Sequence, residues 1–432
     1  MVGVALSAAS VAAWQWTPRV RSSEAVFRRA FMAVYTLTRL GLYGVAFGLL
    51  HMVPRGDINL YMDEAVAAFG GHLVYRDFGT PHAPLDPYLL EGMLRIHNSA
   101  LTIIFFAVLF DLATMWIWMR VGQRFLSTTV FRRASLLMLL NATSLLTVAI
   151  DGQMNSLIAL LLALGVAAWA TSREFLSGVW VAGSGAAVKF LAWIFSPGFF
   201  FVSRRKWAWV AGFLLLTVGV YGGFALAGAD IRYPLHAEGA HKSSSNVYFL
   251  FEVLTGHDLG NRMPDLLLAA SWFGVIGLTW RAARRVFAGS SPGVTALAFR
   301  LLAFSMIAEM MCVQVFSKNT WDRYLVMAMF PLCLLVAECE LWQILLYAVW
   351  CVVNVSYRSF WSTMTIESSA LDQHALALRG NHVALAVAAG EILQTSGNMF
   401  FLCLCVQRLL QLARVDEERV PPGDFDVVEH AR

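Results

Sequence analysis

The chain has 432 residues, of which 58% are hydrophobic and only 14% charged, and its net charge is +4. Soluble domains carry roughly 25% charged residues, so this composition excludes an ordinary soluble protein. The small net charge argues against a nucleic-acid partner. Apolar runs long enough to cross a bilayer recur from end to end, and they read as helices because barrel strands would alternate with polar residues. We therefore expect an all-α polytopic membrane protein.

Run length and interruption predict about twelve transmembrane helices. They lie near 28–52, 99–120, 134–150, 155–171, 175–188, 190–203, 207–228, 265–283, 293–315, 324–338, 341–357 and 382–410. The stretch 175–203 is long enough for one tilted helix. Basic residues flank it on both sides, however, and short basic loops favour the cytoplasm, so a hairpin that turns near Lys189 fits better.

With that hairpin, both termini lie in the cytoplasm. Residues 1–27 are expected to form a cytoplasmic or interfacial N-terminus, 28–410 a single transmembrane domain, and 411–432 a cytoplasmic tail. The non-cytoplasmic segments are then the outer loops at 53–98, 229–264, 316–323 and 358–381. Polar residues gather in these loops, so we expect any active site to face the periplasm of a bacterial plasma membrane, or the lumen of the endoplasmic reticulum.

The first outer loop, residues 53–98, has no apolar run able to span a membrane. Its apolar spacing predicts short amphipathic helices over 58–69 and 85–96, lying on the membrane surface. Asp57 directly precedes the first of them, and Tyr61 shares its helical face. A carboxylate at this position can be a general base, a cation ligand or a helix cap.

Further polar groups are expected on the same side of the membrane. The segment 151–155 is a tight turn between spans, Lys189 is a charge in an apolar stretch, and Lys318 and Arg323 lie in a short loop. Each has a structural alternative: a turn, a lysine reaching the interface, or a local Asp322–Arg323 ion pair. Together, one base and several cations indicate the handling of an anionic headgroup such as a phosphate.

Four short motifs, in chain order, resemble the GT-C glycosyltransferases. The first is Asp57-Ile58-Asn59-Leu60-Tyr61, followed by Val74-Tyr75-Arg76-Asp77 and Ala83-Pro84-Leu85. The others are Gly152-Gln153-Met154-Asn155, Val188-Lys189-Phe190 before Ser196-Pro197, and Phe316-Ser317-Lys318. The most similar patterns belong to bacterial polyprenol-phosphate-mannose-dependent mannosyltransferases and to the enzyme that adds the first mannose to glycosylphosphatidylinositol precursors. Asn59 stands where the latter have a second carboxylate.

The resemblance implies an inverting transfer of a hexose, mannose by analogy, from a polyprenyl-phosphate carrier to a lipid-linked or glycan acceptor. Asp57 would be the general base. The implied substrate-binding residues are Tyr61, Tyr75, Asp77, His82, Gln153, Asn155, Lys189, His241, Lys242, Lys318 and Arg323. Among the cations, Lys189 and Lys318 rank highest for stabilising the phosphate leaving group. No cofactor is required; a divalent cation shared by Asp57 and Asp77 is compatible with the sequence but not demanded by it.

Two other functional classes fit parts of the pattern. A transporter or flippase for a lipid-linked sugar or polar anion would also have twelve spans, but it predicts polar residues toward both faces. A non-catalytic subunit of a membrane complex would use Asp57 only as a cap. The one-sided distribution of polar residues favours the enzyme.

Overall fold

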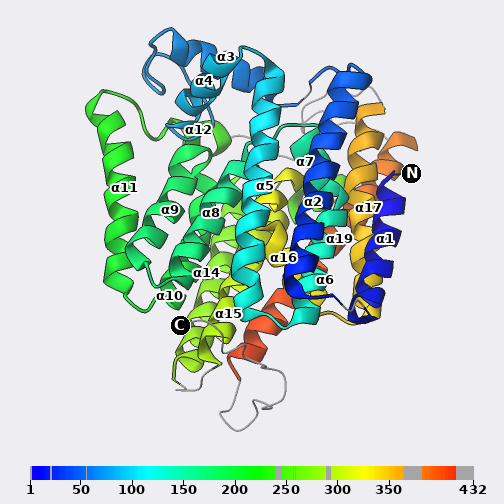
Figure 1. The fold of residues 1–432 in the computed structure, drawn as a ribbon. Coiled ribbons are helices and arrows are strands. Elements are labelled where there is room, and N and C mark those ends of the chain that lie inside the picture. The colour runs from blue at the N-terminus through cyan, green and yellow to red at the C-terminus, as the bar shows by residue number, and fades with distance from the viewer. Residues whose placement is uncertain are drawn as a thin grey trace.

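The computed structural model describes residues 2–19, 22–54, 56–239, 246–255, 257, 259–288, 293–363 and 382–414. Within these ranges the chain is helical and forms no β-strand, only an isolated bridge between Val74 and Phe78. Most helices stand side by side, while α3 and α4 lie across one end of the bundle (Figure 1). The expected all-α polytopic architecture is confirmed.

The helices of the first half are α1 (Val2–Trp16), α2 (Glu24–Tyr43), α3 (Ile58–Phe69), α4 (Asp86–Ile96), α5 (Ala100–Phe125), α6 (Thr128–Leu140), α7 (Ala142–Ala149), α8 (Asn155–Ala170), α9 (Glu174–Ala187) and α10 (Ser196–Val202). The later ones are α11 (Lys206–Leu226), α12 (Tyr233–Gly239), α13 (Val247–Thr255), α14 (Arg262–Val286), α15 (Val294–Phe316), α16 (Met329–Ala337), α17 (Leu341–Thr363) and α19 (His382–Leu412). Short helices of other types are η1 (Thr17–Arg19), η2 (Gly44–Leu49), η3 (Phe190–Phe195) and η4 (Asp322–Ala328).

Five helical segments of the described chain are long and apolar enough to cross a membrane singly: 24–49, 100–125, 206–226, 262–286 and 294–316. Of the other expected spans, 341–357 and 382–410 correspond to the long helices α17 and α19, and the rest to shorter or interrupted helices. One interruption falls at Asn141 between α6 and α7, where the side-chain oxygen accepts a hydrogen bond from Ser144 N at 2.8 Å. This cap satisfies a backbone donor that a broken helix would leave unpaired in an apolar environment.

Two expected segments take a definite form. The stretch 175–203 is a pair of helical pieces, α9 and then η3 with α10, separated by an extended backbone at Lys189. At the N-terminus, where an interfacial segment was expected, α1 packs against α6 and α17 and stands beside them in the bundle (Figure 1).

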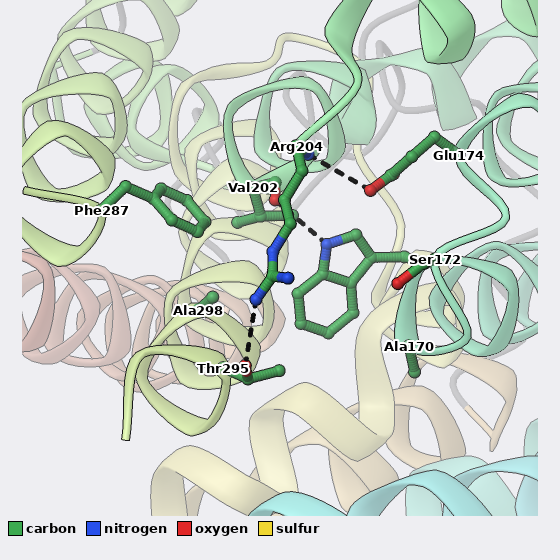
Figure 2. Close-up of a pocket in the computed structure, with 9 residues that line it drawn as sticks. Ala170, Ser172, Glu174, Val202, Arg204, Phe287, Thr295 and Ala298 are labelled. Atoms are coloured by element: carbon green, nitrogen blue, oxygen red, sulfur yellow. Dashed lines mark hydrogen bonds between the residues drawn. The ribbon is translucent and has the colours of Figure 1, made fainter. Parts of the chain in front are cut away.

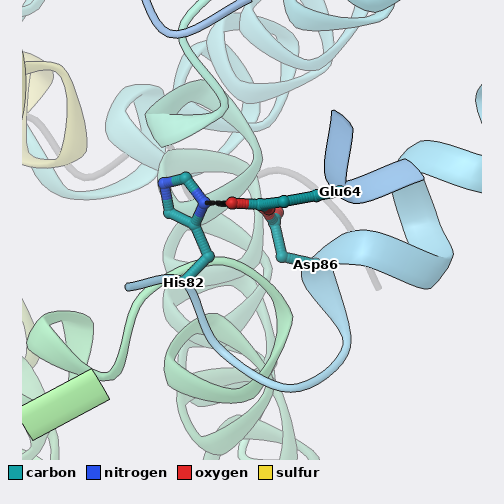
Figure 3. Close-up of side chains that lie close together, drawn as sticks. All are labelled: Glu64, His82 and Asp86. Atoms are coloured by element: carbon teal, nitrogen blue, oxygen red, sulfur yellow. Dashed lines mark hydrogen bonds and ion pairs between the residues drawn. The ribbon is translucent and has the colours of Figure 1, made fainter. Parts of the chain in front are cut away.

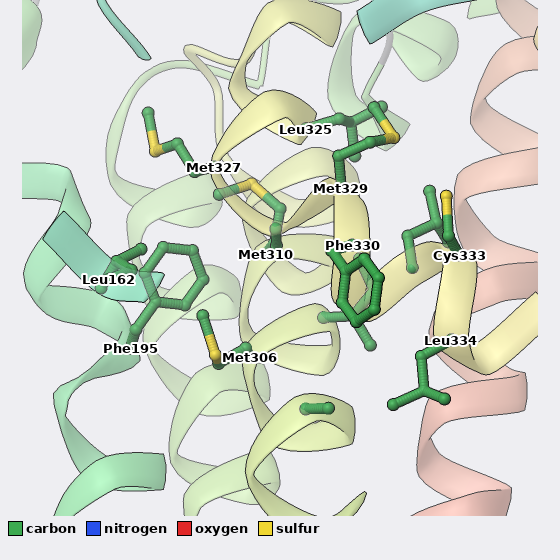
Figure 4. Packing of buried hydrophobic residues seen from close by; sticks show 14 of the residues in the cluster. Leu162, Phe195, Met306, Met310, Leu325, Met327, Met329, Phe330, Cys333 and Leu334 are labelled. Atoms are coloured by element: carbon green, nitrogen blue, oxygen red, sulfur yellow. The ribbon is translucent and has the colours of Figure 1, made fainter. Parts of the chain in front are cut away.

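The centre of the bundle is α15. In the apolar 18-residue stretch of α15 that could cross the membrane, 83% of the residues are buried. In the corresponding stretch of α11, which stands at the edge of the bundle, 11% are buried. Methionines and aromatic rings from α15, η4 and α16 interdigitate there, with Met306, Met310 and Phe330 among them (Figure 4). Flexible methionine side chains fill irregular gaps, which suits a junction of short helices.

Buried charges inside the bundle pair with one another. The Nε of Arg39 on α2 lies 3.3 Å from the Asp111 carboxylate on α5, and the Tyr35 hydroxyl donates to the same carboxylate at 2.8 Å. Arg39 also donates to the backbone carbonyls of Leu139 and Met138, at 3.0 and 3.2 Å. This network makes Asp111 one half of a buried interhelical pair.

Candidate active site

The two amphipathic helices expected in the first outer loop are present as α3 and α4. Asp57 occupies the N-cap position of α3, yet its side chain makes no capping hydrogen bond there. The carboxylate is therefore available for partners outside the helix. Gly70 and Gly71 end α3 as expected, because Gly71 adopts φ +78°, a conformation that glycine reaches without steric cost.

The chain between α3 and α4 is fastened to the turn that follows α9. Ala83 N donates to Val188 O at 2.7 Å, and Leu85 N donates to Ala186 O at 3.1 Å. Because these bonds join the first outer loop to residues directly before Lys189, two motifs far apart in the sequence meet at one end of the bundle. Lys189 is only 8% exposed.

Asp57 is the meeting point of three segments. Its Oδ2 lies 2.7 Å from Nη1 of Arg323, at the start of η4, and accepts a hydrogen bond from Gln153 Nε2 at 3.2 Å. Asn155 Nδ2 in turn donates to the backbone carbonyl of Arg323 at 3.1 Å. Gln153 in the turn and Asn155, the first residue of α8, thus bind the two members of the pair. Arg323 pairs with Asp57 here, rather than with its neighbour Asp322.

Close packing explains why this turn contains a glycine. Gly152 has φ +59°, and a Cβ placed on it would lie 2.6 Å from Ile104 and 2.9 Å from Ile58. Ile58 is the first residue of α3, so the turn presses directly on the helix that Asp57 precedes. Any larger residue would push Gln153 away from the carboxylate.

The electrostatics of the site hold Asp57 in its charged form. Burial alone would raise the pKa of this carboxyl group, but the positive charges of Arg323 and Lys189 and the Gln153 hydrogen bond outweigh it. The net result is a pKa below the ordinary 3.8. Asp57 is therefore a carboxylate at neutral pH, with cationic groups arranged on more than one side.

Lys189 approaches the same centre from the hairpin. Its Nζ lies 4.9 Å from the centroid of the Tyr324 ring, and its charge acts on both Asp57 and Asp86. Arg323 is similarly placed against the ring of Trp321, at 4.6 Å. Each cation thus faces an aromatic ring in or directly before η4, and these rings limit how far each side chain can move.

The remaining predicted cations are placed elsewhere or are not described. Lys318 Nζ forms an ion pair with Asp265 at the start of α14, at 2.8 Å. His241 and Lys242 lie outside the described residues. Among the predicted cations that the structure describes, Arg323 is the one with a direct contact to Asp57, although Lys189 and Lys318 ranked above it on sequence grounds.

Of the other predicted residues in the first outer loop, Asp77 is exposed, whereas Tyr61, Tyr75 and His82 are buried. Asp77 lies in an exposed turn, where Arg76 and the Leu73 backbone N–H bind its carboxylate and lower its pKa to about 2. Tyr61 is buried, with its ring centroid 5.3 Å from that of His82. The Tyr75 hydroxyl donates to the backbone carbonyl of His82.

Two acidic residues that sequence reasoning did not select surround His82. Its Nδ1 lies 2.9 Å from Glu64 Oε1 on α3 and 3.5 Å from Asp86 Oδ2 on α4 (Figure 3). Burial, followed by the Glu64 charge, raises the pKa of Asp86 well above 3.8. A signal for Glu64 existed: it falls on the buried face of α3 with Tyr61 and Ala65, where an acid is unusual.

A separate pocket of about 170 Å³ lies between α8, α9, α10, α14 and α15. Arg204 crosses it, donating from its backbone to Glu174 and from its guanidinium to Thr295 at 3.4 Å (Figure 2). Because α10 lies toward the end of the bundle remote from α3 and α4 (Figure 1), this pocket is distinct from the Asp57 site.

Comparison with known proteins gives one family. The sequence model of glycosyltransferase family 87 matches residues 87–313, a little more than half of the chain. The crystal structure of ArnT from Cupriavidus metallidurans bound to undecaprenyl phosphate is similar over 89% of this chain and 77% of that one, with 11% identity and a TM-score of 0.46. No curated protein matches the sequence.

Proposed function

This chain belongs to glycosyltransferase family 87. On that premise we propose that it transfers a hexose, with mannose as the first candidate, from a polyprenyl-phosphate carrier to a lipid-linked or glycan acceptor. It is a multi-pass membrane glycosyltransferase, as the motifs resembling the GT-C class led us to expect. The choice of donor and sugar rests on those motifs. The reaction would take place at the end of the bundle that carries α3 and α4, on the non-cytoplasmic side.

The observation that carries the proposal is the ionised Asp57 carboxylate held by Arg323 and Gln153. We assign Asp57 as the general base. The acceptor hydroxyl attacks the anomeric carbon from the side opposite the phosphate, so a new glycosidic bond forms as the sugar–phosphate bond breaks, with inversion. Asp57 takes the hydroxyl proton late in this step, when the oxygen has become acidic, so a carboxylate with a low pKa suffices.

The leaving polyprenyl phosphate gains negative charge, and buried cations aimed at it lower the barrier. Lys189 and Arg323 are the candidates that the geometry favours. The Nε of Arg323 is buried and has no hydrogen-bond partner among the described residues, so the guanidinium retains a donor for an incoming oxygen. Lys318 already has a carboxylate partner and is the weaker candidate.

The other residues named from the sequence keep supporting roles in the proposal. Gln153 and Asn155 position Asp57 and Arg323 rather than the sugar, as judged by their contacts. Tyr61, Tyr75, His82 and Asp77 shape the wall of the first outer loop, and of these Asp77 is the one exposed to an approaching substrate.

The test is transfer of label from polyprenyl-phosphate [³H]mannose to a membrane-lipid extract by the purified chain in detergent. Wild type should give a labelled product, and Asp57→Asn should lower the rate by about 10²–10⁴-fold, the usual contribution of a general base. Asp63→Asn is the matched control, since it makes the same change on the exposed face of α3.

Three outcomes would count against the proposal. Equal rates for Asp57→Asn and wild type would remove Asp57 as the base. No transfer from mannose, glucose, galactose or arabinose carriers would refute a polyprenyl-phosphate sugar as the donor. A product of retained anomeric configuration, determined by NMR, would exclude the single inverting displacement.

A further inference from the structure

The cluster of Glu64, His82 and Asp86 lies behind the Asp57 site and is not used by the mechanism above. Its members come from three successive parts of the first outer loop: α3, the segment between the helices, and the first turn of α4. All three side chains are at most 3% exposed. They converge on a common point, with the two carboxylates and the imidazole facing one another (Figure 3).

The spacing of the three side chains suits a bound ion. His82 Nδ1 is 2.9 Å from Glu64 and 3.5 Å from Asp86, and one ligand atom from each residue lies within 4.8 Å of the others. A metal ion about 2.0–2.2 Å from each ligand holds neighbouring ligand atoms roughly 3–3.6 Å apart. The side chains are therefore already gathered at nearly the separation that coordination needs.

Hydrogen bonds within the described part of the protein do not satisfy every polar atom of this cluster. Glu64 accepts from the Thr80 hydroxyl at 2.5 Å and lies 2.9 Å from His82 Nδ1, but neither oxygen of Asp86 accepts a hydrogen bond from any described residue. Protonation of Asp86 would let one of its oxygens donate to the facing Glu64 carboxylate, but the other oxygen would still accept no hydrogen bond from a described residue. A buried polar group without a partner is costly, so its presence points to a missing ligand.

The charge of the cluster indicates the sign of that ligand. Two buried carboxylates face one imidazole, and the charge of Lys189 is the cationic influence that reaches Asp86. A divalent cation would neutralise both carboxylates and bind Nδ1 of His82 in the tautomer that carries its proton on Nε2. One nitrogen and two carboxylate oxygens suit a first-row transition metal such as Mn²⁺ or Zn²⁺.

We propose that Glu64, His82 and Asp86 form a binding site for one divalent transition-metal ion. The ion joins α3 to α4 and so fixes the first outer loop around it. Asp57 lies at the N-terminus of α3, and the backbone bonds of Ala83 and Leu85 to the hairpin come directly before α4. The metal is thus a positioning element: it holds the helix that Asp57 precedes against the turn that carries Lys189.

The site can be tested by binding and stability, without an activity assay. The purified full chain, stripped of metal, is titrated with Mn²⁺ while EPR records the free ion, and the thermal midpoint is measured with and without Mn²⁺ and Zn²⁺. We expect about one saturable Mn²⁺ per chain and a midpoint raised by a few degrees. Asp86→Asn should weaken binding at least about 10-fold and abolish the metal-dependent rise.

Glu91→Gln is the matched control, because Glu91 is also an acid on α4 and its ion pair with Arg95 lies outside the cluster. It should bind Mn²⁺ like wild type. If Asp86→Asn does not yield folded protein, Glu64→Gln replaces it with the same expected loss. Wild type that takes up neither Mn²⁺ nor Zn²⁺, or an Asp86→Asn chain that binds as tightly as the control, overturns the proposal. Because no sugar transfer is measured, the result stands whether or not Asp57 is the base.

Discussion

Two arginine–aspartate pairs in this protein have similar chemistry and different surroundings. Arg39 and Asp111 are 0% and 3% exposed, and the arginine donates to two backbone carbonyls as well as to the carboxylate. Arg323 and Asp57 are 12% and 20% exposed, and Arg323 Nε has no partner among the described residues. The first pair is saturated and sealed between helices. The second is open and retains capacity for another ligand.

The comparison teaches that a buried ion pair is not by itself a sign of function. What distinguishes the Asp57 pair is incompleteness: a donor left over, partial exposure, and a second cation nearby in Lys189. Inside the bundle, an Arg39 donor without a partner would lower the stability of the fold. Such a loss of stability is retained only where the unpaired group serves a function. The two pairs should therefore respond to mutation in opposite ways, one in stability and the other in catalysis.

The largest effect on stability is expected from breaking the sealed pair. Arg39→Met should destabilise the folded chain by about 3–5 kcal/mol, because it leaves the Asp111 carboxylate buried without its counter-charge. Unfolding in detergent, followed by intrinsic fluorescence against denaturant, would measure this. If Arg39→Met instead unfolds like wild type but loses transfer activity, the distinction between the two pairs fails.

The corresponding change in the open pair should act on catalysis. Arg323→Gln should lower kcat by about 10²–10³-fold, as loss of one donor to a developing negative charge typically does, with a much smaller effect on unfolding. It should also raise the pKa of Asp57, since burial remains and the leading charge that lowers this pKa is gone. Wild type should therefore keep its activity down to pH values below the ordinary titration range of an aspartate, and the acid limb in Arg323→Gln should move to higher pH.

A pH–rate profile of kcat/KM for both proteins checks the second part of this prediction. An unchanged acid limb in Arg323→Gln would show that the activity does not depend on the ionisation of Asp57. Asn155→Ala is a useful companion, because Asn155 contacts the backbone of Arg323 and not Asp57 itself. It should lower activity while leaving the acid limb in place.

The smallest effect is expected at Lys318. Its partner Asp265 is 59% exposed, and ion pairs of this kind contribute roughly 0–1 kcal/mol. Lys318→Gln should change stability by less than about 1 kcal/mol and activity by less than about tenfold, as measured by the same unfolding and transfer assays. If Lys318→Gln lost as much activity as Arg323→Gln, Lys318 would again be a leading candidate for stabilising the phosphate leaving group, as its motif predicted.

Much of the fold could be predicted because hydrophobicity dictates it locally. Helices over 58–69 and 85–96 were expected from apolar spacing alone and are found at Ile58–Phe69 and Asp86–Ile96. The helical pieces on either side of Lys189 follow from a charge and flanking basic residues. The role of α1 could not be predicted in this way. Whether an apolar helix lies on a surface or packs against α6 and α17 depends on partners hundreds of residues away.

The site was predictable in its motifs but not in its pairings. Asp57, Gln153 and Arg323 were each selected from short patterns, yet nothing in those patterns states that all three meet. The cations were ranked by motif, and geometry reverses that order for Lys318 and Arg323. Glu64 and Asp86 were missed because a single acid in a surface helix looks solvated until its buried face is known.

The long separation between Asp57 and its partners has a consequence for biosynthesis. Asp57 and α3 emerge from the ribosome before Arg323, which follows only after α15, more than half a chain length later. Until Arg323 is synthesised, the nascent chain carries the Asp57 carboxylate without this counter-charge. The site is therefore completed only after α15 has been made, and we expect a chain that stalls after α14 to have no transfer activity.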